Sequence, residues 1–126
     1  MALLRHPDAF AAASASSAVT SWHHYDTIYT ERYMGLPARN EDGYKASSPV
    51  NAVANLEGKL MLVHNFQDDN VLFQNTQHMM EALQRAGKQF EMMFYPLKTH
   101  GVTGPLRLHW LQTMTGFFDR NLGAGK

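Results

Sequence analysis

Two residues in the second half of the chain, Asp68 and His100, have the side-chain types that proton transfer requires. Each follows a stretch whose apolar pattern predicts a strand, residues 59–64 and residues 89–95, and a helical pattern separates the two. The carboxyl ends of parallel strands meet at one edge of a sheet, where functional loops gather. A carboxylate there can hold an imidazole in one tautomer and stabilise the imidazolium that forms when it takes a proton from a hydroxyl. The sequence therefore predicts a carboxylate–imidazole pair.

Spacing alone leaves other interpretations of this pair open. Asp68 and Asp69 precede a predicted helix and could cap it, and a loop histidine is often only solvated. Aspartate and histidine are also metal-ligand types, but the chain has no HxH or HExxH spacing, so we expect neither a metal nor another cofactor. The order Asp before His nevertheless matches the last two members of the Ser, Asp, His series of α/β-hydrolases.

The elements that must hold the pair alternate between strand and helix. We expect strands over residues 10–19, 59–64 and 89–95. Apolar residues at helical spacing predict helices over residues 76–86 and 106–121, ended near Gly87 and Gly123. Shorter predicted elements are a helix end at residues 2–5, a polar loop at 40–44, and a short helix from Pro49 with Ser48 as N-cap. This order indicates an α/β fold with a parallel sheet flanked by helices.

The composition excludes several classes of protein. The 126 residues suffice for one domain, which we place at residues 1–126. Eleven basic and 11 acidic residues balance, without a long run of either sign, so nothing indicates a nucleic-acid partner. No apolar run approaches the ~20 residues of a membrane-spanning helix, and the absence of cysteine excludes disulfides. The composition does not indicate a compartment.

Three segments resemble a known family. Residues 25–35 read YDTIYTERYMG, which closely resembles a segment of dipeptidyl peptidase IV-like members of the prolyl oligopeptidase family. Residues 62–74, with LVH followed by DDNV and FQ, resemble that family's acid-bearing loop. His100-Gly101 resembles its histidine loop, and the resemblance extends from residue 3 to residue 122.

The resemblance implies a role for each matching position. Asp68 is the triad acid, His100 is the triad base, and Asn70 orients the carbonyl of the N-terminal residue of a peptide substrate. The pocket for the substrate's proline or alanine side chain is lined by Val19, Trp22, Tyr25, Tyr29 and Val71. The aromatic members of this set could instead be ordinary core, although polar-tipped rings suit a pocket wall. The implied activity is release of N-terminal dipeptides after Pro or Ala, and the full-length protein is expected to form a homodimer.

The chain also departs from the family pattern. Asn65 stands where the family has Gly, and because Asn tolerates positive φ we expect the turn to survive with an altered shape. His64 belongs to the motif and is expected to be structural.

No G-x-S-x-G nucleophile motif occurs in the sequence, so we expect the serine to lie before residue 1. The chain is then the C-terminal portion of an α/β-hydrolase peptidase domain, with an incomplete sheet and no activity by itself. The alternatives are a non-catalytic remnant that serves only as an interaction domain, and an acyl-peptide hydrolase or esterase on the same fold.

Overall fold

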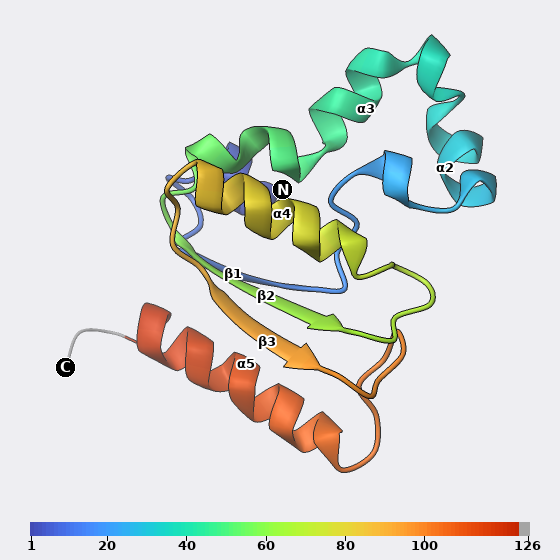
Figure 1. Ribbon diagram of the computed structural model, residues 1–126. Helices are drawn as coiled ribbons and strands as arrows, with labels where there is room; N and C mark the ends of the chain where they lie inside the picture. The colour runs from blue at the N-terminus through green and yellow to red at the C-terminus, as the bar shows by residue number, and fades with distance from the viewer. Residues whose placement is uncertain (124–126) are drawn as a thin grey trace.

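A computed structural model describes residues 1–123 and contains a sheet of three strands, β1 (Ala12–Ser16), β2 (Lys59–Asn65) and β3 (Glu91–Tyr95). The strand order is β1-β2-β3 and both pairs are parallel, as predicted (Figure 1). Ala12 lies opposite Lys59, and Met61 lies opposite Glu91. The first strand is shorter than the predicted range of residues 10–19, because the backbone leaves the sheet at Ser17.

The central strand β2 is apolar on both faces, which is why it lies in the middle of the sheet. Leu60 and Leu62 face one apolar cluster, and Met61 and Val63 face another. The first cluster includes Leu3 and Leu4 of α1 (Ala2–Arg5) and Met79 and Leu83 of α4 (Gln74–Arg85). The second includes Phe117 of α5 (Leu106–Leu122), which is fully buried.

These clusters hold the helices on opposite faces of the sheet. Figure 1 shows α4 on one face and α5 on the other. Helix α4 begins two residues earlier than predicted and ends, as predicted, against Gly87, which adopts φ of 67°. The N–H groups of Gly87 and Lys88 bond the carbonyls of Gln84 and Leu83, so glycine allows the turn that satisfies the end of the helix.

An arm of short helices leaves the sheet between β1 and β2. It comprises η1 (Trp22–His24), α2 (Thr27–Met34), η2 (Pro37–Arg39), α3 (Glu41–Ser47) and η3 (Pro49–Asn55). In Figure 1 helices α2 and α3 extend beyond the sheet.

One prediction within this arm is wrong, and another is confirmed in position but not in its side-chain contact. Residues 40–44 are not a polar loop, because Asn40 caps α3 by accepting a hydrogen bond from the Gly43 N–H, and Tyr44 is buried in the helix. Ser48 does occupy the N-cap position of η3, with Pro49 first in the helix, but the Ser48 hydroxyl donates to the Tyr44 carbonyl at 2.8 Å and caps nothing.

The loops that follow β2 and β3 lie side by side, because the two strands are parallel neighbours. Phe66 N–H donates to the Tyr95 carbonyl and Gln67 N–H donates to the Lys98 carbonyl, both at 3.2 Å. These bonds extend the contact between the two strands past their ends. Within residues 1–123 there is no helix of the length and apolarity needed to cross a membrane.

Candidate active site

The loop after β2 folds back on itself around the carboxylate of Asp68. Asp68 N–H donates to the Asn65 carbonyl at 3.2 Å. The Asp68 Oδ1 atom then accepts the N–H groups of Asn70 at 3.1 Å and Val71 at 2.9 Å. The carboxylate therefore closes its own loop, and it does not cap α4, whose N-cap position is Phe73. The capping interpretation of Asp68 is wrong.

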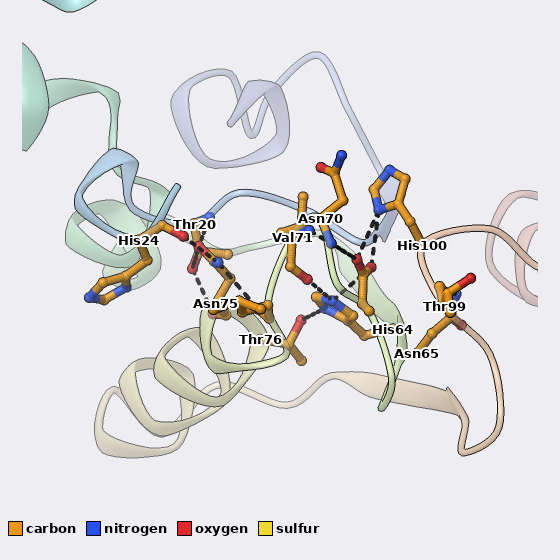
Figure 2. Close-up of polar contacts among 12 residues, drawn as sticks. Thr20, His24, His64, Asn65, Asn70, Val71, Asn75, Thr76, Thr99 and His100 are labelled. Atoms are coloured by element: carbon orange, nitrogen blue, oxygen red, sulfur yellow. Dashed lines mark hydrogen bonds and ion pairs between the residues drawn. The ribbon is translucent and has the colours of Figure 1, made fainter. Parts of the chain in front are cut away.

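His100 approaches this carboxylate from the neighbouring loop. Its Nδ1 atom lies 3.1 Å from both Oδ1 and Oδ2 of Asp68, so the two side chains form the contact that the sequence predicts (Figure 2). A carboxylate can only accept, so Nδ1 carries the proton and Nε2 presents its lone pair. The side chain of Asp68 is completely buried, whereas that of His100 is 49% exposed.

Two opposing effects set the pKa of Asp68. Burial on its own would raise the pKa of this carboxyl. The Ser17 hydroxyl, the N–H groups of Val71 and Asn70, and His100 oppose burial and hold the pKa below its ordinary value of 3.8. The Ser17 Oγ atom makes no hydrogen bond of ordinary geometry within residues 1–123, whereas the two backbone N–H groups and His100 do bond the carboxylate. The carboxylate is therefore ionised at neutral pH.

A second histidine, His64 of β2, contacts the same carboxylate from below the loop. His64 is completely buried, and its Nε2 atom lies 2.8 Å from the Val71 carbonyl and 3.3 Å from Asp68 Oδ2. Because the carbonyl can only accept, Nε2 carries a proton; Nδ1 lies 2.6 Å from the Thr76 hydroxyl. His64 thus supports the acid from the strand, a contact that the sequence did not predict.

The aromatic residues implied as pocket lining gather in one cluster. The rings of Trp22 and Tyr29 stack at 6.1 Å, and Tyr25 meets both edge-on, at 6.0 Å and 5.6 Å. Tyr29 is 48% exposed, so the cluster forms a wall open to solvent and not a dry core. The Tyr25 hydroxyl donates to Asn70 Oδ1 at 2.9 Å, which joins this wall to the acid loop.

The two valines of the predicted pocket occupy different surroundings. Val19 lines a 340 Å³ cavity together with Trp22, and Trp22 also lines a smaller 120 Å³ cavity with Tyr29. Val71 is buried, and its backbone serves the acid through its N–H and carbonyl groups. The structure therefore brings Val19 to the aromatic wall and Val71 to the acid loop.

A buried asparagine fastens the wall to helix α4, which the sequence analysis missed. Asn75 is completely buried; its Oδ1 atom accepts the Thr20 N–H at 3.0 Å, and its Nδ2 group donates to the His24 carbonyl at 3.2 Å. The Thr20 hydroxyl also donates to the Asn75 carbonyl at 2.6 Å (Figure 2). Only the uncommon placement of an amide in the first turn of an amphipathic helix hinted at this role.

Asn65 differs from its expected conformation. Ser17, with φ of 45°, is the only non-glycine residue of positive φ in residues 1–123, so Asn65 makes the turn without the left-handed backbone. Its Nδ2 group instead donates to the Thr99 carbonyl at 2.6 Å. The strained residue is Ser17, at the end of β1, and such a backbone costs of order 1–3 kcal/mol. Strain of this kind is commonly found at functional sites.

Comparison with known proteins gives one family. The model of the prolyl oligopeptidase family matches residues 1–125. Dipeptidyl peptidase 8 of Homo sapiens is 38% identical over 128 residues, which cover 98% of this chain and 14% of the relative. Dipeptidyl peptidase 4 of Felis catus is 38% identical over 115 residues, covering 88% of this chain and 15% of the relative.

Solved structures give the same relationship. The crystal structure of Porphyromonas gingivalis dipeptidyl peptidase 4 matches with a TM-score of 0.91 at 38% identity, covering 94% of this chain and 17% of that one. The parallel sheet flanked by helices is therefore that of an α/β-hydrolase domain. This chain spans only a small part of the length of the relatives it matches.

Proposed function

The chain belongs to the prolyl oligopeptidase family, and we propose that it supplies the acid, the base and part of the substrate pocket of a serine peptidase. The proposed reaction releases N-terminal dipeptides after Pro or Ala. The observation that carries this proposal is the Asp68–His100 contact at 3.1 Å, which leaves the Nε2 atom of His100 free to accept a proton. The nucleophilic serine comes from outside residues 1–126, because the sequence contains no G-x-S-x-G motif.

The proposed chemistry assigns one task to each member of the pair. His100 Nε2 takes the proton of the serine hydroxyl while the serine oxygen attacks the substrate carbonyl carbon. The same imidazolium then gives that proton to the leaving amine, and an acyl-enzyme remains. Asp68 stays ionised throughout and stabilises the imidazolium, in agreement with its lowered pKa.

Asn70 and the aromatic wall orient the substrate in this proposal. The Asn70 Oδ1 atom accepts the Tyr25 hydroxyl, so the amide is turned with its Nδ2 group available to donate to a peptide carbonyl. Trp22 and Tyr29, which line the 120 Å³ cavity, would contact the proline or alanine side chain of the substrate.

We also propose that the full-length protein forms a homodimer, and helix α5 supports this. Its outer face exposes Leu108 at 61% and Leu111 at 44%. A second copy covering these side chains would remove them from water.

A non-catalytic interaction domain is the alternative function, and the missing serine motif is the observation that favours it. A chimera separates the two. Residues 1–122 replace the matching part of Porphyromonas gingivalis dipeptidyl peptidase 4, and hydrolysis of a Gly-Pro chromogenic substrate is measured. The peptidase proposal expects turnover by the chimera and no turnover by the isolated chain. Within the chimera, kcat should fall about 10⁶-fold in His100→Ala and about 10⁴-fold in Asp68→Asn. A folded but inactive chimera supports the interaction domain, and turnover of esters alone supports an esterase.

A further inference from the structure

The loop that carries His100 has few anchors. Thr99, His100 and Gly101 are all exposed, and among residues 1–123 the His100 ring is hydrogen-bonded through Nδ1 alone. Downstream, Val102 is buried in the apolar cluster that contains Phe117. Upstream, the anchor nearest to the histidine is the bond from Asn65 to the Thr99 carbonyl.

Asn65 is the last residue of β2 and is only 2% exposed. Its Nδ2 group lies 2.6 Å from the Thr99 carbonyl oxygen. That carbonyl and the N–H of His100 belong to one rigid peptide plane. A bond that fixes the carbonyl therefore fixes the orientation from which the His100 side chain departs.

The surroundings of Asn65 fix the orientation of its side-chain amide. Its Nδ2 group donates to the Thr99 carbonyl. Rotating the amide by 180° would place Oδ1 against the Thr99 oxygen, so the observed orientation is the only favourable one.

We propose that Asn65 is a positioning residue for His100, holding the base-bearing loop against the acid-bearing strand. This inference rests on the proposed function of His100 as the base. A glycine at position 65, as in the resembled motif, would have no side chain to make this bond. In this chain the Asn65 amide adds a side-chain link beside the two backbone bonds from Phe66 and Gln67. The acid and base are thus coupled twice, directly between their side chains and through the backbones that carry them.

The test reads the His100 tautomer and needs no turnover. The isolated chain is labelled with ¹⁵N, and the two ring nitrogen shifts of His100 are measured at about pH 8.5, where imidazoles are neutral. In the unmodified chain Nδ1 should carry the proton. Asn65→Gly and Asn65→Ala should move the shifts toward the mixture of tautomers found in a free imidazole. Asp68→Asn, which removes the carboxylate that accepts from His100 Nδ1, gives the shifts expected when this partner is lost.

Two further variants separate positioning from loss of stability. Asn65→Asp keeps the shape of the side chain but places a carboxylate against the Thr99 oxygen, so it should disturb the tautomer at least as much as Asn65→Ala. Asn40→Ala removes a comparable amide bond, 2.7 Å to the Met34 carbonyl, and should lower stability without moving the His100 shifts. Urea unfolding verifies that each variant is folded.

The outcomes are distinct. Unchanged His100 shifts in folded Asn65 variants would overturn the proposal, as would equal changes in Asn40→Ala. Altered shifts in the Asn65 variants beside an inactive chimera would retain the positioning role and reject only the peptidase function.

Discussion

The loops after β2 and β3 bring the acid and the base to the same place by different means. The Asp68 carboxylate is completely buried and is contacted by the N–H groups of Asn70 and Val71, by His64 and by His100. His100 is half-exposed, and within the part of the chain that the structure describes its ring is bonded only at Nδ1. The acid is thus part of the interior of the domain, whereas the base lies on its surface.

This difference suits the two roles that we propose for Asp68 and His100. A group that only orients and stabilises charge gains from a fixed, dry environment. A group that must take a proton from one atom and give it to another has to keep one nitrogen uncovered. The structure therefore holds Asp68 in a fixed, buried position and leaves His100 accessible.

Removing the acid should have the largest effect on stability. Asp68→Ala leaves the N–H groups of Asn70 and Val71 without their shared acceptor, whereas His64 Nε2 keeps the Val71 carbonyl. We expect a loss of about 2–4 kcal/mol in the free energy of unfolding, because each buried donor left unpaired costs about 1–3 kcal/mol. Urea unfolding followed by circular dichroism measures it. A loss below about 1 kcal/mol would be typical of a surface group and would contradict the contrast between the loops.

Protonation of Asp68 at low pH should lower stability as well, by less than removal of its side chain. The pKa of Asp68 is lower in the folded chain than the ordinary 3.8, so its stabilisation is complete above that value and is lost as pH falls toward the folded pKa. Unfolding at pH 5 and pH 3 should therefore show a smaller acid loss in Asp68→Asn than in the unmodified chain.

His24 also makes stability depend on pH, but equally in both chains. Burial, with the nearby His78 and His23, lowers the pKa of His24 below 6.5, so its own contribution is lost as pH falls below that value. That contribution is common to both chains and cancels in their difference. An identical acid loss in the two chains would mean that Asp68 is not the group responsible.

Removing the base should have the smallest effect on stability. His100→Ala loses one half-exposed contact, so we expect a change within about 1 kcal/mol. Urea unfolding beside Asp68→Ala gives the ratio of the two effects directly. Comparable losses for the two variants would show that the base loop is as integral to the interior as the acid loop.

Local patterns in the sequence were sufficient for the elements that frame the site. The apolar run of β2 and the helical spacing of α4 predicted both elements and, through them, the meeting of Asp68 with His100. Helix α3 was missed because Asn40, with Gly43 three residues later, resembles a loop. In fact the same asparagine caps the helix, and burial of Tyr44 secures it.

The contacts that tune the site could not be predicted from local patterns. Asn65 bonds a residue 34 positions away, and Asn75 bonds one 55 positions away. Such pairings depend on the final packing of strands and loops. Even His64, four residues from Asp68, reaches the carboxylate only because the chain turns back at the end of β2.

The Thr20–Asn75 bonds hold the start of the arm against α4, and the β1–β2 ladder holds the two strands that the arm leaves and enters. The separation of these two points, the roots of the arm, therefore does not depend on the path of the chain between them. Gly35 and Leu36, where α2 ends, are exposed. Residues can be gained or lost at such a bend without moving the roots. A change in the length of the arm at this bend should therefore leave the contact between Asp68 and His100 in place.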